Sequence, residues 1–295
     1  MKTPDPLLET VSATAWGVAE RRARTDIPYA KDIYGILDAR ILHATPSDEL
    51  GTLTKFRFDH LTPYFEARFK MINLILKEHK PEQILELAAG YSPRGIALAW
   101  EHPDLTYIEM DLLTVAREKW QTIDTLSIIK ERRTPSNLFL EDGDVTRADD
   151  FTRVTRWLRP GPVTVVSEGL MRYLPKTRQL DVARNVRDLL AERGGTWITP
   201  DITARGMMAT GPLKQIVREQ NHRLREITGL DVRENYFANE EEARTFYENR
   251  GFTIERRSFN EVRDILVSPK EENIPAAEVD DALGTCAVYV MRGYE

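Results

Sequence analysis

From residue 83 onward, short apolar runs alternate with longer stretches whose apolar residues recur at helical spacing. The runs that predict strands are 83–88, 105–110, 137–140, 163–167 and 195–201, and the stretches between them that predict helices are 94–101, 112–121, 149–158 and 176–192. Strands that alternate with helices in this way form parallel sheets with helices on both faces. The pattern therefore predicts a doubly wound α/β sheet.

Two further apolar runs, 252–259 and 286–293, close the chain without an obvious long amphipathic helix between them. A parallel crossover needs such a helix, whereas two antiparallel strands do not. We therefore expect a mostly parallel seven-stranded sheet that ends in an antiparallel pair of C-terminal strands.

The first 80 residues have a different pattern, because apolar positions recur there at helical spacing without any strand-like run. Residues 7–25 and 61–79 predict amphipathic helices, and Pro63 falls in the first turn of the second, where proline is tolerated. This pattern predicts a helical cap over residues 1–80.

The rest of the chain, 81–295, then forms a Rossmann-like domain. After its fifth strand, the polar and helix-biased stretch 203–248 predicts an insert that acts as a lid over the sheet edge. This insert carries Met207, Met208, Gln215 and His222. Methionines suit an adaptable apolar pocket, although filling a core explains them equally well.

Composition describes an ordinary soluble globular protein, with 41% hydrophobic and 30% charged residues and a net charge of -6. The arginine clusters, such as Arg21, Arg22 and Arg24, stand beside acidic residues, so we expect solvated faces rather than a nucleic-acid surface. No run approaches the 18 or more apolar residues of a membrane span. We expect a cytoplasmic protein with neither a nucleic acid nor a membrane as partner.

A single cysteine, Cys286, excludes an internal disulfide and a cysteine-rich zinc site. It lies in the apolar run "CAVYVMRG", which predicts a buried and inert thiol. We expect no metal centre.

Acidic residues stand at the carboxyl ends of four successive predicted strands. They are Glu86, then Glu109 and Asp111, then Asp142 and Asp144, and finally Glu168. Ligands of open α/β sheets bind outside this edge. Each acid alone could be a solvated loop residue, but the four strand ends together predict a ligand site.

The turn after the first strand, in "ILELAAGYSPRG", has the small residues that present backbone N–H groups at a helix N-terminus. Ala88 replaces the first glycine of the G-x-G-x-x-G fingerprint and Gly95 is displaced, which argues against NAD. Asp111 follows Gly90 by 21 residues, a distance at which an acid meets a ribose. An acidic rim repels phosphates and suits a sulfonium, an amine and ribose hydroxyls, so S-adenosylmethionine is the expected cofactor.

Four segments, "ILELAAGYSPRGIALA", "YIEMDLL", "GDV" and "SEGLMRYLP", resemble in order and spacing the leucine carboxyl methyltransferase family. Bacterial members of that family include polyketide O-methyltransferases of the tetracenomycin type. "VSATAWGVAERRART" also resembles the start of these bacterial members. The resemblance implies an S-adenosylmethionine-dependent methyltransferase whose acceptor atom is an oxygen.

The resemblance also implies roles for the matching residues. By this resemblance, Arg68 binds the methionine carboxylate and Glu168 lies near the methionine amine. Ala88 and Gly90 form the small-residue turn. Asp111 accepts hydrogen bonds from the ribose hydroxyls, and Asp144 with the N–H of Val145 binds the adenine edge. Glu86 joins them as the acid at the first strand end. Eukaryotic members have glycine at the position of Ala88, so we expect a less close backbone approach there.

Arg172 and Tyr173 follow Glu168 and are expected to project over the transferred methyl group. Arg172 could anchor an acceptor carboxylate, and Tyr173 could wall the pocket or orient the nucleophile. The resemblance implies that the acceptor is a carboxylate or a phenolic hydroxyl of a small molecule or peptide. A phenol needs a base. His222 is the best isolated candidate for that base, although a solvent-facing position on a helix is the simpler expectation for it. The other histidines have no more in their favour: His43, His60, His79 and His102.

Two other functions share part of this pattern. A nicotinamide-dependent oxidoreductase also uses a strand, a turn, a helix and a downstream acid, but the glycine fingerprint is missing and the C-terminal strands are expected to be antiparallel. A nucleoside-binding module without catalysis would retain the same acids. The oligomeric state and the identity of the acceptor are left open by the sequence.

Overall fold

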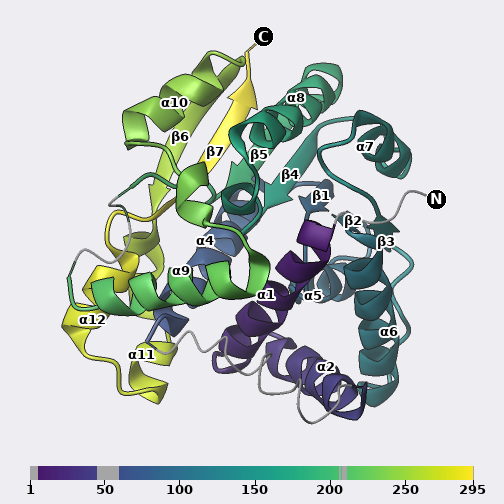
Figure 1. Cartoon of the computed structure of the whole chain (residues 1–295). Helices are drawn as coiled ribbons and strands as arrows, with labels where there is room; N and C mark the ends of the chain where they lie inside the picture. Colours follow the sequence, from purple (N-terminus) through teal and green to yellow (C-terminus); the bar gives the residue numbers. More distant parts are fainter. Residues whose placement is uncertain (1–5, 45–59, 206, 208–210, 295) are drawn as a thin grey trace.

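A seven-stranded sheet with the order β3-β2-β1-β4-β5-β7-β6 forms the centre of the molecule (Figure 1). Its strands are β1 Gln83–Leu87, β2 Thr106–Asp111, β3 Leu138–Asp142, β4 Val163–Ser167, β5 Gly195–Thr199, β6 Phe252–Ser258 and β7 Ala287–Gly293. Strands β1 to β5 pair in parallel, and β7 is antiparallel to both β5 and β6. The predicted fold class is confirmed, including the antiparallel C-terminal pair.

The computed structural model describes residues 6–44, 60–205, 207 and 211–294, and for 6–13, 41–44, 227 and 228 the backbone alone. None of the helices in this part of the chain is long and apolar enough to cross a membrane. Cys286 is buried, as its apolar run predicts.

Alternation along the strands divides the core between the two faces of the sheet. Leu85 and Leu87 lie in a cluster with the helices α7 Ala148–Thr155, α8 Lys176–Arg193 and α10 Glu240–Glu248, whereas Ile84 lies in another cluster with α4 Thr62–His79. Figure 1 shows α7, α8 and α10 on one side of the sheet, and α4, α5 (Arg94–Glu101) and α6 (Leu113–Ile129) on the other. Because α4 shares its core with the strands, a domain boundary at residue 80 would cut through that core.

The helices α1 Pro6–Ala23 and α2 Ala30–Ala44 share a core with α5 and α6, and Leu138 and Leu140 of the edge strand β3 pack against it. Their apolar side chains and those beneath them form one cluster: Trp16, Ala19, Ile33, Leu37, Tyr91, Ile96, Val115, Ile123 and Leu126. A Cβ added to Gly90 would lie 3.3 Å from the Cβ of Ala15. The middle of α1 therefore lies directly against the turn that follows β1.

After β5 the chain leaves the sheet, folds back on itself at Phe237 and rejoins the sheet at β6. Ala204 bridges Phe237, and the N–H of Arg205 donates to the Phe237 carbonyl at 2.9 Å, which closes the base of the excursion. The excursion contains α9 Lys214–Thr228 and the short helix η2 Val232–Asn235. The following helix, α10, packs into the core through Ala243 and Tyr247. Of the predicted lid span 203–248, the last part is thus a core helix; Met208 lies outside the described residues.

Between β6 and β7 stand η3 Phe259–Ile265, α11 Ser268–Glu271 and α12 Ala276–Leu283. All three contact α4. None of them is a crossover helix, because β6 and β7 are antiparallel neighbours.

Candidate functional site

The turn after β1 has a strained backbone that Asp111 holds in place. Ala88 has φ +51° and Gly90 has φ +52°, in the left-handed region that non-glycine residues seldom adopt. The N–H of Gly90 donates to Oδ2 of Asp111 at 2.6 Å, and the N–H of Leu112 donates to Oδ1 at 2.7 Å. Asp111 therefore ties the turn after β1 to the end of β2.

Asp111 retains capacity for a ligand. A carboxylate has about four lone-pair sites, and two backbone N–H groups occupy two of them. Burial raises the pKa of Asp111, and these N–H groups oppose the rise because they favour the charged form. Asp111 can accept hydrogen bonds from the hydroxyl groups of a bound sugar in addition to holding the turn.

The end of β3 lies beside the end of β2, because Asp142 pairs in register with Asp111. In the turn that follows, Oδ1 of Asp144 accepts hydrogen bonds from the N–H of Thr146 at 2.9 Å and from its hydroxyl at 2.7 Å. The carbonyl of Val145 accepts from Nδ2 of Asn185 at 2.9 Å. Asp111, Asp144 and Val145 thus stand at or just after the ends of two neighbouring strands, and their roles toward a cofactor stay predictions.

A buried ion cluster occupies the ends of β1 and β4. Glu168 accepts from Nε of Arg68 at 2.8 Å, from Nη2 of Arg94 at 2.6 Å, and from Nη2 of Arg22. All four residues are at most 9% exposed. Three arginines from α1, α4 and α5 therefore converge on one carboxylate.

Glu86 is the second carboxylate of this cluster. It accepts a hydrogen bond from Nη1 of Arg94 and another from the hydroxyl of Tyr107 at 2.6 Å. The ring of Phe69 lies beneath the guanidinium groups of Arg94 and Arg22, with ring centroids 4.4 and 5.3 Å from their Cζ atoms. Three guanidinium groups and two carboxylates leave the cluster with one net positive charge.

Burial and charge act in opposite directions on these groups. Burial alone would raise the pKa of Glu168, but Arg22, Arg68 and Arg94 outweigh it and hold that pKa well below its usual range. Burial lowers the pKa of Arg22, whereas for Arg94 the neighbouring Glu86 and Glu168 reverse the effect of burial and raise the pKa. The arginines therefore keep Glu168 ionised at neutral pH.

This cluster corrects two expectations from the sequence. The strand ends do not form a uniform acidic rim, because arginines neutralise Glu86 and Glu168. Arg22 does not belong to a solvated face: it is 5% exposed and reaches Glu168 across 146 positions of sequence. The sequence contained one indication that Arg22 is buried, which is its spacing from two alanines. Ala15, Ala19 and Arg22 fall on one face of α1.

Two more residues of the site were not predicted. Arg94 stands inside the quoted turn and starts α5, where it bridges Glu86 and Glu168. Asp201, after β5, accepts the N–H groups of Gly169, Leu170 and Met171 at 2.8, 2.8 and 3.2 Å. Asp201 thus fixes the loop that carries Glu168. Asp201 is the last residue of the predicted strand 195–201, and an acid at a strand end was a signal available in the sequence.

Arg172 lies in η1 Met171–Tyr173 and is held by the excursion after β5. Its Nη2 donates to the hydroxyl of Tyr236 at 2.9 Å and contacts Oδ1 of Asn221 at 3.4 Å. Its Nε is buried and has no hydrogen-bond partner within the described part of the chain. Tyr173 packs with Tyr236, Leu224 and Val232. The predicted acceptor residues therefore lie under α9 and η2.

The histidine side chains that the structure describes are exposed. The side chain of His222 is 72% exposed and lies 3.4 Å from Glu226, so the solvent-facing interpretation is confirmed. His60, His79 and His102 are exposed as well. The side chain of His43 lies outside the described residues.

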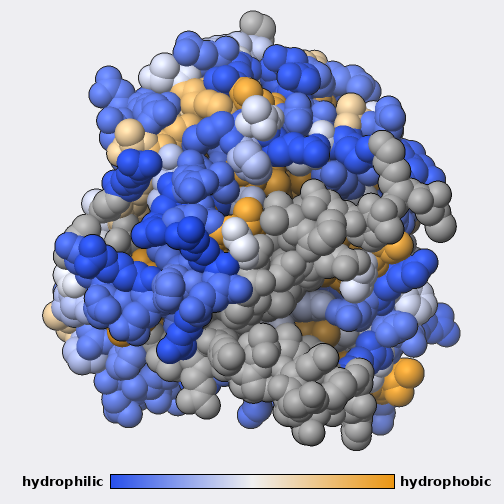
Figure 2. Space-filling model, viewed as in Figure 1, coloured by the Kyte–Doolittle hydropathy of each residue, from blue (hydrophilic) through white to orange (hydrophobic). Residues whose placement is uncertain are grey.

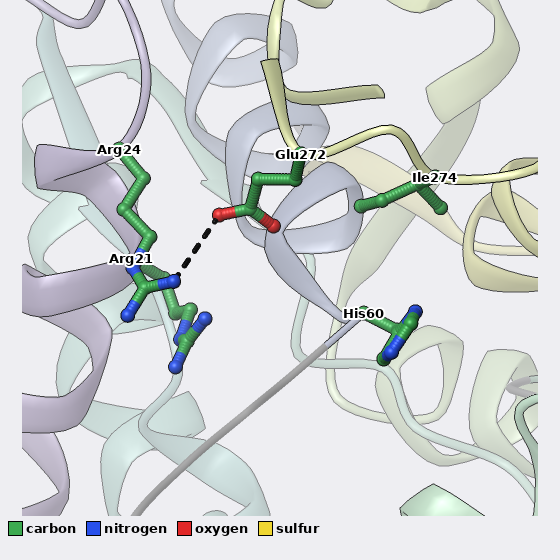
Figure 3. A pocket seen from close by; sticks show the side chains of 5 residues that line it. All are labelled: Arg21, Arg24, His60, Glu272 and Ile274. Atoms are coloured by element: carbon green, nitrogen blue, oxygen red, sulfur yellow. Dashed lines mark ion pairs between the residues drawn. The ribbon is translucent and has the colours of Figure 1, made fainter. Parts of the chain in front are cut away.

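A separate open hollow of about 350 Å³ lies beside the end of α1 (Figure 3). It is lined by Arg21, Arg24, His60, Glu272 and Ile274. Arg24 pairs with Glu272 at 3.7 Å. None of these residues follows a strand of the parallel sheet, so we place the candidate site at the strand ends.

No protein-family model and no curated protein matches this sequence. Among solved structures, a DUF574 family protein from Streptomyces avermitilis MA-4680 has a TM-score of 0.54 at 14% identity, over 96% of this chain and 97% of that chain. The methyltransferase domain of bacterial CtHen1 has a TM-score of 0.50 at 13% identity, over 79% and 100%. TnmH has a TM-score of 0.50 at 10% identity, over 84% of this chain and 59% of TnmH.

The matched region spans 51% of the length of PigF, solved with SAH, at a TM-score of 0.47 and 13% identity. Identities of this size show a shared fold and nothing finer. The fold is thus that of a known methyltransferase domain, and membership of the leucine carboxyl methyltransferase family stays a prediction.

Proposed function

We propose that this chain is an S-adenosylmethionine-dependent O-methyltransferase that acts on a carboxylate or phenolic hydroxyl of a small molecule or peptide. The observation that carries the proposal is the division of the strand edge into two parts. Arginines gather at the ends of β1 and β4, and hydrogen-bond acceptors stand at the ends of β2 and β3. An amino-acid end and a nucleoside end need these two environments side by side.

The β1 and β4 part fits the amino-acid end of S-adenosylmethionine. Arg68 donates to Glu168 through Nε, and its Nη atoms lie 3.6 Å from the place a Cβ would take on Gly169. These Nη groups form the planar donor pair that binds a carboxylate through two hydrogen bonds. The net positive charge of the cluster favours that carboxylate, while Glu168 supplies the acid expected near the amine.

The β2 and β3 part fits the nucleoside end. Asp111 has lone pairs left for ribose hydroxyls. It also holds the turn that contains Ala88 and Gly90, because it accepts a hydrogen bond from the N–H of Gly90. Asp144 and the N–H of Val145 stand one strand further, where the adenine edge is expected. The chemistry of these donors and acceptors therefore agrees with the roles that the sequence resemblance implies.

When bound, S-adenosylmethionine supplies a methyl group on a sulfonium, whose departure leaves a neutral thioether that needs no acid. The chain must then position an oxygen nucleophile and keep water away, and correct positioning contributes about 7 to 11 kcal/mol to the barrier reduction. Arg172 is suited to this task, because its buried Nε–H lacks a partner within the described residues. Tyr173 and Tyr236 flank its guanidinium, with ring centroids 5.7 and 5.8 Å from Cζ.

A nicotinamide-dependent oxidoreductase fits the sheet less well. The usual dinucleotide-binding sheet continues in the order 3-2-1-4-5-6. Here the antiparallel strand β7 stands between β5 and β6 instead. No specific feature of the site favours a binding module without catalysis.

Calorimetric titration of the purified protein with S-adenosylmethionine, S-adenosylhomocysteine and NADH tests the class of function. We expect heat of binding with the first two ligands and none with NADH. Saturable binding of NADH without binding of S-adenosylmethionine would overturn the proposal.

A labelled methyl donor offered with pools of carboxylic acids, phenols and peptides then tests transfer. For a carboxylate acceptor, Arg172→Ala should raise the apparent KM about tenfold and leave the affinity for S-adenosylmethionine unchanged. The wild-type rate should be flat above about pH 6, because carboxyl groups titrate near 4. A rate that climbs toward pH 10, with the chemical step rate-limiting, identifies a phenol instead.

A further inference from the structure

The helix α6 exposes large apolar side chains to solvent. Leu113, Trp120, Ile128 and Ile129 are 41%, 55%, 72% and 57% exposed. Three other large hydrophobic side chains with comparable exposure occur in the described part of the chain, and they are scattered over other elements. Figure 2 shows hydrophobic spheres at the lower right edge of an otherwise mainly hydrophilic face, near the end of α6 in Figure 1. Large exposed apolar residues that cluster on one element mark an interaction surface.

Leu113, Trp120 and Ile128 lie on one face of the helix, whereas Ile129 stands at its C-terminal end and points to another side. At 3.6 residues per turn, Leu113, Arg117, Trp120, Asp124 and Ile128 form a single stripe along α6, which we call the α6 stripe. The buried residues of α6 are Val115, Lys119, Thr122, Ile123, Leu126 and Ser127, and they occupy the opposite side. The α6 stripe therefore points away from the sheet.

We propose that the α6 stripe binds the α6 stripe of a second copy of this chain, with the two helices antiparallel around a two-fold axis. When the axis passes between positions 120 and 121, Leu113 of one copy faces Ile128 of the other, and the two Trp120 side chains meet near the centre. In the same register Arg117 faces Asp124. One register thus matches apolar with apolar and positive with negative, as an isologous interface requires.

The charges of the stripe support contact between two copies rather than within one. Arg117 and Asp124 are both exposed, and neither forms an ion pair within the described part of the chain. They stand two turns apart, about 10 Å along the axis, which is beyond the spacing at which side chains of one helix pair. A second copy in the proposed register gives each charge a partner.

A single pair of helices covers less area than the roughly 1,200 to 2,000 Å² of a stable interface. We therefore expect a reversible dimer that dissociates on dilution. Sedimentation of the full chain at concentrations from about 1 µM to about 100 µM should show a mass that rises from one copy to two. A wild-type mass of one copy throughout this range would overturn the proposal.

Trp120→Glu tests whether the stripe is the contact. This variant should sediment as a single copy at every concentration, because it places two carboxylates at the centre of the interface. Ile265→Glu is the matched control, since Ile265 is also exposed and lies on η3, and it should dimerise like the wild type. Dimerisation of Trp120→Glu, or its loss in both correctly folded variants, would contradict the assignment.

A charge swap tests the register. Arg117→Asp and Asp124→Arg should each weaken the dimer about tenfold, because each places two pairs of like charges opposite one another. The double variant with both changes should recover the wild-type dissociation constant. If the double variant stays as weak as the singles, the two helices do not meet in this register and the proposed geometry is wrong.

Discussion

The two parts of the strand edge carry the same kind of residue and hold it in different ways. At the ends of β1 and β4, Glu86 and Glu168 are buried beneath arginines. At the ends of β2 and β3, Asp111 and Asp144 accept hydrogen bonds from backbone N–H groups, which come from Gly90 and Leu112 for Asp111 and from Thr146 for Asp144. The partner of each carboxylate, and not its residue type, therefore decides what it can bind.

The physical consequence is a change of sign along one edge. The ion cluster has a net positive charge and attracts an anionic group. Asp111 and Asp144 have unused lone pairs, so they suit neutral donors such as hydroxyl and amino groups. A zwitterionic amino acid joined to a nucleoside meets both conditions.

The largest expected effect is on stability and follows from Glu168→Gln. The change leaves Arg22, Arg68 and Arg94 buried around a neutral side chain, and breaking a buried ion pair in this way costs about 3 to 5 kcal/mol. Urea unfolding at pH 7 measures the loss in the free energy of unfolding. Asp111→Asn is the matched control and should cost about 0.5 to 1.5 kcal/mol, because only backbone hydrogen bonds are affected. Equal losses in the two variants would remove the distinction between the two parts.

The pH dependence of stability gives a second and smaller effect. The pKa of Glu168 is depressed in the folded state, so its contribution is fully present above the unfolded value near 4.3 and is lost as the pH falls toward the folded pKa. The difference in unfolding free energy between wild type and Glu168→Gln should be constant above about pH 5 and shrink below about pH 4. A difference that grows on acidification would show that arginines do not hold this carboxylate ionised.

Asp111→Ala should weaken S-adenosylmethionine binding by about 1.5 to 3 kcal/mol, the range for hydrogen bonds to a charged group. Because Asp111 also accepts the N–H groups of Gly90 and Leu112, the variant should lose about 1 to 2 kcal/mol of stability as well. Calorimetry and urea unfolding measure the two quantities. Unchanged affinity in a stably folded variant would remove Asp111 from the ribose site.

The smallest expected effect concerns the backbone of the turn. Ala88 has a positive φ, whereas Ala89 does not, so Ala88→Gly relieves strain that Ala89→Gly does not. We expect Ala88→Gly to raise the free energy of unfolding by about 0.5 kcal/mol and Ala89→Gly to lower it by about 0.5 to 1 kcal/mol. Thermal unfolding of both variants checks the sign; a loss at both positions would mean that the methyl group of Ala88 contributes packing.

The sheet was predictable because each strand from β1 to β5 is a short apolar run between helical patterns. Its antiparallel end was predictable because no crossover helix was evident before β7. The packing of α4 against the sheet was not predictable. The pattern of an amphipathic helix shows that one of its faces is buried, but it does not show which element covers that face.

The acids of the site were visible in the sequence, since they stand at strand ends. Their arginine partners were not, because Arg22 and Arg68 lie 146 and 100 positions away from Glu168 and reach it only in the folded chain. Gly95 shows the same limit. A Cβ added there would lie 2.1 Å from Oε1 of Glu109, which pairs with the buried Lys119. In the sequence, Gly95 was interpreted as a displaced glycine of the G-x-G-x-x-G fingerprint. In the structure, its lack of a side chain leaves space for the buried ion pair of Glu109 and Lys119.

The most direct test of the account compares S-adenosylhomocysteine with 5′-methylthioadenosine, which has the nucleoside but neither the carboxylate nor the amine. Arg68→Lys keeps the charge and loses the planar donor pair, so it should weaken S-adenosylhomocysteine binding about tenfold and leave 5′-methylthioadenosine binding within about twofold of wild type. Asp111→Ala should weaken both ligands by the same factor. Equal losses for both ligands in Arg68→Lys, or a loss for S-adenosylhomocysteine alone in Asp111→Ala, would contradict the division of the strand edge into an amino-acid part and a nucleoside part.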